Sequence, residues 1–301
     1  MRFRVTVAVV LLAITFSLVG VGLYSSLDNA QNDPIVDEVK VDYSFKVMSF
    51  NVRTISFDLN GNPNDSIVLR APLILEQIAD ENPDLIGCQE WTATHEYHIV
   101  KQLSKDYGYY AISRDGTPFG EMGAIFYKKE RFELIESSTF WLSDTPNEIS
   151  LGWDGGCHRI CSTVLLKDLK SGKTIEFNNT HLDNKGVEAR EKGTALITAQ
   201  VVESEYPSIV VGDYNYNTKN YNYTYCTERM DDARLLSEGA VTTATYNGWD
   251  TSALNVGGYP IDHIMLKKDN FNASGYKVLN YQINNLFASD HFAIVAVVEV
   301  K

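Results

Sequence analysis

Six short segments of this chain carry acidic, amide or histidine side chains, and most of them directly follow or lie inside apolar runs. The six are Ser49-Phe50-Asn51, Gln89-Glu90, Thr180-His181-Leu182-Asp183, Gly212-Asp213-Tyr214-Asn215, Ile261-Asp262-His263 and Ser289-Asp290-His291. Because such apolar runs are typical of β-strands, a sheet could deliver these side chains to one edge. Carboxylate and amide oxygens bind hard cations, and a bound cation promotes the hydrolysis of phosphate esters. The pattern therefore indicates a metal-assisted phosphoesterase.

Two of these segments place polar side chains two residues apart. Asp213 and Asn215 follow the apolar run 209–212, so in an extended backbone both side chains leave the same face of the strand. Together they could orient a water molecule and hold a phosphate oxygen, although an Asx turn favours the same two residue types. His181 and Asp183 repeat the spacing, and the imidazole could donate to a phosphoryl oxygen or to the leaving group. We therefore predict catalytic roles for Asp213, Asn215 and His181, and a substrate contact for Asp183.

Three further side chains stand at the ends of predicted strands. Glu90 ends a hydrophobic strand, where a charge is costly unless a cation or hydrogen bonds compensate it, so we predict a metal ligand. Asn51 could support that ligand or bind the phosphate, and a strand-end cap explains it equally well. Arg159 opens a strand and could face a phosphate as a planar bidentate donor, with a surface ion pair as the competing interpretation.

The C-terminal third contains two carboxylate and imidazole pairs, Asp262-His263 and Asp290-His291. One such pair alone is a weak signal, but two pairs and the histidine of the third segment together favour a hydrolytic site. Other hydrolase chemistries lack their motifs. The chain has no G-x-S-x-G elbow, and the segment His95-Glu96-Tyr97-His98 is one residue too short for the H-E-x-x-H motif of zinc proteases.

Composition limits the class of partner. The chain has 301 residues, 44% of them hydrophobic, and no composition break divides it, so we predict one large core. The formal net charge is −13, and no stripe of Lys and Arg supplies the phosphate contacts that binding of long nucleic acid requires. We therefore expect a small or locally gripped phosphate-ester substrate, no extended basic surface for duplex nucleic acid, and a monomer.

The N-terminus has the pattern of a membrane-targeting segment. Arg2 and Arg4 precede the apolar stretch 5–23, and a polar stretch follows up to Ala30. A secretory signal peptide and an uncleaved membrane anchor both fit this pattern, whereas a buried core helix is disfavoured because the positive residues lie only on the outer side. In both favoured cases the rest of the chain lies outside the cytosol, either secreted or tethered to the membrane.

A polar, acidic stretch separates this segment from the predicted domain. We interpret residues 1–30 as the signal or anchor, 31–42 as a linker and 43–301 as the folded domain. Because no second hydrophobic span of comparable length follows, we predict that the domain itself is soluble.

Four cysteines are too few for a disulfide scaffold. They are Cys88, Cys157, Cys161 and Cys226. No second metal-spaced pair accompanies Cys157 and Cys161, so a zinc site is disfavoured. A short-loop disulfide between these two residues and a pair of buried thiols both stay open.

Alternation of apolar residues and turn signals predicts the strands and helices. The predicted strands cover 43–52, 84–89, 124–127, 132–137, 159–166, 174–179, 208–211, 264–266 and 293–300. The predicted helices cover 72–81, 95–103 and 186–203. We expect Pro72 in the first turn of its helix, strands 159–166 and 174–179 as antiparallel neighbours, and the Tyr- and Asn-rich stretch 214–225 as an exposed loop near the site.

The ordered motifs carry a family resemblance. Ser-Phe-Asn-Val-Arg, Gln-Glu, Thr-His-Leu-Asp, Gly-Asp-Tyr-Asn, Ile-Asp-His-Ile and Ser-Asp-His-Phe, spread over 45–298, resemble the endonuclease/exonuclease/phosphatase (DNase I-like) superfamily. Within it, the segments 139–146, 152–154 and 159–161 look like a secreted, bacterial-type branch. The resemblance implies an α/β fold, a four-layered sandwich of two packed mixed β-sheets flanked by helices, with Mg²⁺ or Mn²⁺ at the strand ends.

The resemblance also implies roles for the motif residues. Glu90 would be the chief metal ligand, with Asn51 and Asp290 beside it, while Asp213 and Asn215 would position the nucleophile and the phosphate.

The histidines would act on the phosphate. His291, oriented by Asp262, would polarise the attacking water or the phosphate, and His181 would stabilise the pentacovalent oxygens. The chain departs mildly from the family pattern: Tyr214 replaces a usual Phe or Leu, Asn184 stands where this branch often has His, and no Pro follows Asn215.

The sequence thus favours a divalent-metal-dependent phosphodiesterase or phosphatase that uses in-line attack of water. The alternative is a non-catalytic binding or surface protein that retains the fold. Monoester and diester substrates both stay open, because the choice depends on the loops 58–66, 141–156 and 214–225.

Overall fold

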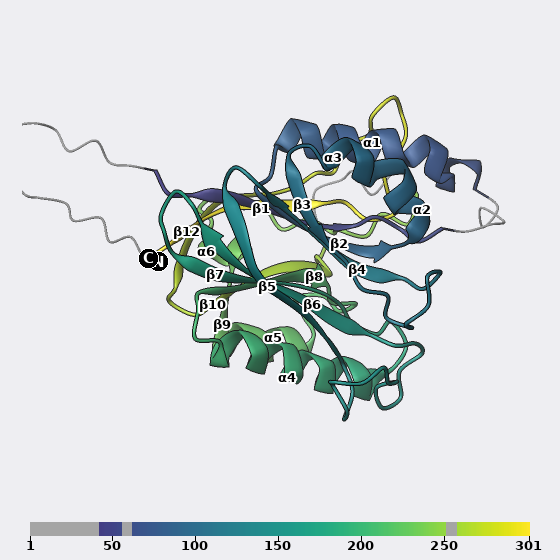
Figure 1. Cartoon of the computed structure of the whole chain (residues 1–301). Helices are drawn as coiled ribbons and strands as arrows, with labels where there is room; N and C mark the ends of the chain where they lie inside the picture. The colour runs from purple at the N-terminus through teal and green to yellow at the C-terminus, as the bar shows by residue number, and fades with distance from the viewer. Residues whose placement is uncertain (1–41, 56–61, 251–257) are drawn as a thin grey trace, which may run out of the picture. The chain divides into compact units, whose positions relative to one another are not determined.

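Two six-stranded β-sheets pack against each other in the computed structural model, which describes residues 42–55, 62–250 and 258–301 (Figure 1). The predicted signal or anchor, nearly all of the predicted linker and part of the loop 58–66 lie outside these residues. No helix in the described part of the chain combines the length and the apolarity needed to cross a membrane.

The first sheet has the order β11-β12-β1-β2-β4-β3. Its strands are β1 (Phe45–Asn51), β2 (Leu85–Trp91), β3 (Tyr107–Tyr110), β4 (Met122–Lys128), β11 (Phe271–Val278) and β12 (Ile294–Val300). β1 and β2 run parallel, and the other neighbours are antiparallel, so the sheet is mixed.

The second sheet has the order β5-β6-β7-β8-β10-β9. Its strands are β5 (Phe132–Trp141), β6 (Ile160–Asp168), β7 (Thr174–His181), β8 (Ser208–Asp213), β9 (Met230–Asp232) and β10 (Asp262–Lys267). β7 and β8 are its parallel pair, and β6 and β7 form the predicted antiparallel neighbours.

Helices cover the outer faces of both sheets (Figure 1). The first sheet carries α1 (Ile67–Glu81) and the helical stretch α2 (Ala93–His95), η3 (Glu96–Val100) and α3 (Lys101–Leu103). The second sheet carries α4 (Val187–Glu203) and α5 (Tyr221–Arg229), while the short elements η2 (Pro63–Asp65) and α6 (Ala233–Leu236) lie in connections.

Alternating apolar side chains explain why four layers form. Along β8, Ile209 and Val211 join the core between the two sheets, whereas Val210 points to the core under α4 and α5. Along β1, Val47 faces the other sheet and Met48 faces α1. Both faces of these central strands are therefore apolar and buried. The predicted four-layered α/β sandwich is confirmed.

Two predictions about helices are wrong in detail. Pro72 does not open its helix, because the carbonyl of Ser66 already accepts hydrogen bonds from the N–H groups of Leu69 and Arg70, and α1 begins at Ile67. The stretch 214–225 is not an exposed loop. Tyr214, Tyr216 and Tyr223 are buried against the ring of His263, and the side chain of Asn220 caps α5.

The four cysteines are all free, and all of them lie in the described residues. Cys88, Cys161 and Cys226 are buried, whereas Cys157 is partly exposed. Cys157 and Cys161 therefore form no disulfide, and of these two thiols Cys161 is the buried one.

Candidate active site

Strand directions bring the six polar segments to one edge of the sandwich. The parallel strands β1 and β2 end at Asn51 and near Glu90, and the parallel strands β7 and β8 end at His181 and Asp213. β10 runs antiparallel to β8, so its first residue, Asp262, pairs with the last residue of β8. β12 runs antiparallel to β1, which brings Asp290 and His291, just before β12, to the same edge.

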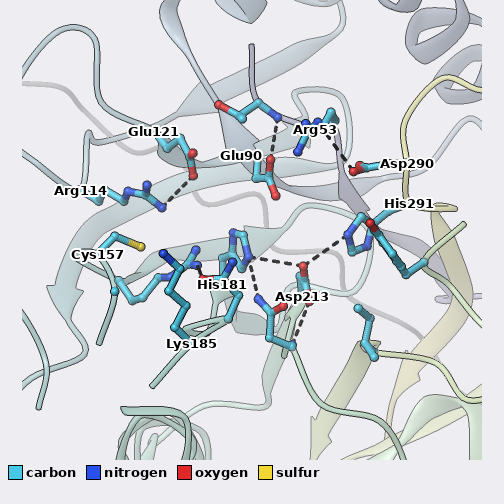
Figure 2. A pocket seen from close by; sticks show the side chains of 17 residues that line it. Arg53, Glu90, Arg114, Glu121, Cys157, His181, Lys185, Asp213, Asp290 and His291 are labelled. Atoms are coloured by element: carbon cyan, nitrogen blue, oxygen red, sulfur yellow. Dashed lines mark hydrogen bonds and ion pairs between the residues drawn. The ribbon is translucent and has the colours of Figure 1, made fainter. Parts of the chain in front are cut away.

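A pocket of about 520 Å³ opens at this edge (Figure 2). It is lined by most of the predicted site residues: Glu90, Arg159, His181, Asp213, Asn215, Asp290 and His291. Ten further residues complete the lining: Arg53, Thr54, Arg114, Glu121, Gly156, Cys157, Asn184, Lys185, Tyr246 and Ile261. Asn51, Asp183 and Asp262 lie behind the wall of the pocket.

Glu90 is held in an unusual backbone conformation. Its φ of 58° lies in the left-handed region, at an irregularity in the pairing of β2 with β4 between Cys88 and Trp91. Such strain in a non-glycine residue persists only where the surroundings enforce it. The N–H of Thr54 donates to Glu90 Oε2 at 2.7 Å. Burial raises the pKa of Glu90, but this hydrogen bond, the amide of Asn51 and the charge of His291 outweigh burial and hold the pKa below its ordinary value.

Asn51 bridges two carboxylates from different sheets. Its Nδ2 donates to Glu90 Oε1 and to Asp213 Oδ2, both at 3.0 Å. Its oxygen, the atom that would bind a cation, accepts the N–H of Arg53 at 3.0 Å. The amide of Asn51 therefore positions Glu90 and Asp213. Because a carbonyl oxygen has a second lone pair, the metal contact of Asn51 stays a prediction.

His291 lies between two carboxylates. Its Nδ1 is 3.0 Å from Asp262 Oδ2, and its Nε2 is 3.6 Å from Asp213 Oδ2. Burial alone would lower the pKa of His291, but the two carboxylates raise it to about 10, so the ring is protonated. Burial, with the nearby charge of Asp262, raises the pKa of Asp213 to about 7.

Asp290 faces an arginine that the sequence motif contained without a predicted role. Arg53 Nε lies 3.7 Å from Asp290 Oδ2 and 3.4 Å from Asp65 Oδ2. Burial raises the pKa of Asp290, and the negative charge of Glu90 adds to this rise, so the two predicted metal ligands are electrostatic neighbours. Burial lowers the pKa of the Arg53 guanidinium, but the charges of Asp290 and Glu90 outweigh burial and raise it.

Asp213 and Asn215 form an Asx turn and also line the pocket, so the two interpretations of their spacing are compatible. The N–H of Asn215 donates to Asp213 Oδ1 at 2.9 Å, which is an Asx turn, and the φ of Asn215 is 52°. The side chain of Asn215 nevertheless reaches the pocket, where its Nδ2 is 3.0 Å from His181 Nε2 and donates to the carbonyl of Leu182 at 2.9 Å. The Asx turn therefore points the side-chain amide of Asn215 into the pocket.

His181 remains neutral. Burial lowers its pKa well below the ordinary value, and the positive charges of Arg159 and Arg114 lower it further. Its Nε2 lies 3.4 Å from Asp213 Oδ2.

Asp183 departs from the predicted substrate contact. Its carboxylate accepts the N–H groups of Gly156 at 3.0 Å, Lys185 at 2.8 Å and Gly186 at 2.7 Å, and it lies 3.6 Å from Arg159 Nε. The backbone therefore occupies the acceptors that a substrate would need. Asp183 holds the loops and Arg159 in place, because the chain turns after β7 and the extended i, i+2 geometry ends at His181.

His263 also lies away from the pocket. Side chains alternate along β10, so the residue after Asp262 faces α5 and packs on Tyr214 and Tyr223. Burial lowers its pKa. Of the two C-terminal pairs, only Asp290 and His291 both line the pocket.

Several pocket residues escaped sequence reasoning. Arg114 and Glu121 come from the connection between β3 and β4 and form an ion pair at 2.7 Å. The ring of Tyr246 packs edge-on against His291 with 5.0 Å between centroids. Arg53 differs from these residues, because it belongs to the first motif, Ser-Phe-Asn-Val-Arg, and the sequence could have indicated its role. The others stand in irregular loops without a local pattern.

The donors of the pocket suit a hard divalent cation. Ligand atoms of Asp213, Asp262 and His291 lie within 4.8 Å of one another, and Glu90 and Asp290 add two carboxylates. Asp262 Oδ1 is buried and has no hydrogen-bond partner among the described residues. An oxygen-rich set of this kind fits Mg²⁺ or Mn²⁺ better than softer metals.

Comparison with known proteins identifies the family of this chain. The model of the Endonuclease/Exonuclease/phosphatase family matches residues 48–291. The chain belongs to this family. Its members are hydrolases that act on phosphate esters.

Solved structures of the family have the same fold. An endonuclease/exonuclease/phosphatase family protein from Bacteroides thetaiotaomicron is 28% identical with a TM-score of 0.78, covering 85% of this chain and 97% of the other. A mannosyl-6-phosphatase from the same organism is 27% identical with a TM-score of 0.75, covering 85% and 99%. An uncharacterized protein of Acanthamoeba polyphaga mimivirus is 27% identical in an alignment of 262 positions, which covers 76% of this chain and 91% of the relative.

Proposed function

We propose that this protein is a divalent-metal-dependent phosphoesterase that hydrolyses its substrate by in-line attack of water on phosphorus. The observation that carries the proposal is the bridge of Asn51 between Glu90 and Asp213, in the pocket that also holds Asp290 and His291. Family membership and the similarity to a mannosyl-6-phosphatase support it.

Glu90 and Asp290 would hold the Mg²⁺ or Mn²⁺ ion. When bound, the ion supplies Lewis-acid stabilisation of the charge on the phosphoryl oxygens. Asn51 keeps the Glu90 carboxylate in place, and the low pKa of Glu90 keeps that carboxylate ionised.

The remaining residues act on the water and the phosphate. Asp213, with a pKa of about 7, is suited to accept the proton of the attacking water. Protonated His291 places a positive charge beside the phosphate, and Asp262 keeps it protonated and oriented. Neutral His181 is the proposed hydrogen-bond donor to the pentacovalent oxygens, and Asn215 fixes its ring.

The sequence supports a proposal about the place of action and the substrate. We propose that the domain acts as a monomer outside the cytosol, secreted or tethered through residues 1–30, on a small or locally gripped phosphate ester. The net charge of −13 supports a substrate other than duplex nucleic acid.

The test measures ester hydrolysis by the full-length protein across phosphomonoesters and phosphodiesters with Mg²⁺ and Mn²⁺. We expect turnover by the wild type and losses of at least about 10²-fold in Glu90→Ala, Asp213→Ala and His291→Ala. Undiminished hydrolysis in all three variants would overturn the proposal. Binding of phosphate esters without turnover by the wild type would favour the non-catalytic alternative.

A further inference from the structure

The pocket has a second, cationic side. Figure 2 shows Arg114 and Lys185 on one side of His181, and Asp290 and His291 on the other. Arg159 lines the cationic side as well. The proposed mechanism does not use these three basic side chains, although the chain as a whole is strongly acidic.

Arg159 has buried donors without acceptors. The residue is only 7% exposed, and within the described part of the chain its Nη1 and Nε atoms have no hydrogen-bond partner. Nε makes only the 3.6 Å ion pair with Asp183, and Nη2 donates to Asn184 Oδ1 at 3.4 Å. A buried donor without a partner is costly. Since Arg159 lines the pocket, a ligand acceptor is the natural partner of its free N–H groups.

The carboxylate of Asp183 holds Arg159 and the backbone of Lys185 in place. Asp183 accepts the backbone N–H groups of Gly156 and Lys185 and pairs with Arg159, so one buried carboxylate organises the cationic side. The Lys185 stem crosses Gly156 closely: a Cβ on that glycine would lie 3.0 Å from Lys185 Cδ. Among the described residues, the Lys185 ammonium forms no ion pair.

Arg114 pairs with two carboxylates but keeps a buried donor without an acceptor. Its Nη1 binds Glu121 at 2.7 Å, and its Nε lies 3.8 Å from Asp115 Oδ2, which is too far for a hydrogen bond. Among the residues that the structure describes, this buried Nε has no hydrogen-bond partner. Both arginines act on His181, whose pKa they depress, so the cationic side adjoins the catalytic centre. Three cations at this wall, Arg114, Arg159 and Lys185, line the pocket together with one carboxylate, Glu121. Asp115 and Asp183, which pair with the two arginines, do not line it.

We infer that Arg114, Arg159 and Lys185 form a second anion-binding subsite, which holds an acidic group of the substrate other than the phosphate that is hydrolysed. This inference rests on the proposed phosphoesterase function. The substrate would then carry a second oxyanion, a phosphate or a carboxylate, on the group attached to the scissile phosphate. The pocket volume of about 520 Å³ accommodates a ligand of that size.

Paired substrates test the inference in the full-length protein. Fructose 1,6-bisphosphate is compared with fructose 6-phosphate, and 6-phosphogluconate with glucose 6-phosphate, by release of phosphate with Mg²⁺. We expect kcat/KM to be about tenfold higher for the compound with the second acidic group, as one charge-assisted contact provides. The first pair tests whether the subsite prefers a phosphate, and the second pair tests whether it prefers a carboxylate. Equal kcat/KM values within both pairs would overturn the inference.

Two variants should change this preference in opposite directions. Arg114→Gln removes a cation and should reduce the preference about tenfold, whereas Glu121→Gln removes the competing carboxylate and should increase it. Arg229→Gln, on the exposed end of α5, changes the net charge as Arg114→Gln does and should leave the preference as it is. If the Arg114 and Glu121 variants shift the preference in the same direction, the ion pair is merely structural and the inference fails.

A binding measurement separates this inference from the proposed function. In EDTA, calorimetry with inorganic phosphate should show weaker binding to Arg114→Gln and tighter binding to Glu121→Gln than to the wild type. If no ester is hydrolysed with any metal but these affinities change as expected, the phosphoesterase proposal fails and the subsite stands. If esters are hydrolysed but neither the affinities nor the substrate preferences change, the subsite fails alone.

Discussion

His291 Nδ1 lies 3.0 Å from Asp262 Oδ2, and this contact fixes both the orientation and the charge of the imidazole. Because the partner carboxylate is buried and stands at the start of β10 in the other sheet, the ring cannot turn away without leaving a charge unpaired. The pH dependence of kcat should therefore change when this contact is removed.

Asp262→Asn should lower kcat by about 10²-fold or more, because the ring loses its charged partner. It should also move the alkaline loss of activity to lower pH. The wild-type His291 keeps its proton up to a pKa of about 10, and removal of one negative charge lowers that pKa. The measurement is kcat against pH from 6 to 10, with the exposed Asp269→Asn as control. An unchanged alkaline limb in Asp262→Asn would contradict the assigned role.

Asn51→Ala should separate positioning from metal binding. Loss of the bridge leaves the carboxylates of Glu90 and Asp213 without their shared donor, so kcat/KM should fall by about 10²-fold. Asn51→Asp places a third carboxylate in the same space and should not restore the rate, whereas a metal-ligand role would favour it. Recovery of activity in Asn51→Asp would show that the residue binds the cation.

The side chains at strand ends are the part of the site that the sequence predicts best. Asp213 and Glu90 could be placed at one edge because each follows an apolar run and because parallel strands end together. The left-handed backbone of Glu90 was not predictable, since the irregularity in β2 depends on pairing with β4, a strand that lies more than thirty residues further along the chain.

Tertiary contacts determine which side chains are buried at positions where the sequence pattern gives no answer. The tyrosines after Asp213 are polar enough to suggest a loop, yet they pack around His263, a residue from a different strand. Along α4, the apolar Val202 is 41% exposed, because the buried stripe runs through Ala189, Ile197 and Val201. The Arg114 and Glu121 pair stands in an irregular loop, where periodicity carries no information.

Asn179 ties the two sheets together and should matter for stability. Its buried Nδ2 donates to the carbonyls of Cys88 and Ala124 at 2.8 and 2.9 Å, and its Oδ1 accepts from Gln89 at 2.7 Å. Asn179→Ala should lower the free energy of unfolding by about 3 kcal/mol, since it leaves buried groups unpaired. Urea unfolding measures this, with the exposed Asn147→Ala as control. A loss no larger than that of the control would show that the sheets do not depend on this contact.

His95 should make the fold sensitive to acid. Burial, with the charge of Arg70, lowers the pKa of His95 from 6.5 to about 3. The unfolded chain therefore binds a proton that the folded chain excludes, and stability falls by about 1.4 kcal/mol per pH unit as the pH drops from about 6.5 towards 3.

His95→Gln tests that dependence, because glutamine can accept the N–H of Thr92 as the imidazole does but does not titrate. The free energy of unfolding should depend less on pH between 6 and 4 in this variant than in the wild type. His98→Gln, in the same helical stretch, is the matched control. Equal pH slopes in the wild type and in His95→Gln would exclude the buried imidazole as the source.

In the proposed mechanism, a cation held by Glu90 drives hydrolysis of a phosphate ester. The most direct measurement removes metal from the full-length protein with EDTA and then titrates Mg²⁺ or Mn²⁺ back, following phosphate release by the wild type and by Glu90→Gln. The account predicts no turnover without metal, restored turnover in the wild type, and a requirement for about 10²-fold more metal in the variant. Full activity in EDTA, or identical metal titrations for both proteins, would contradict it.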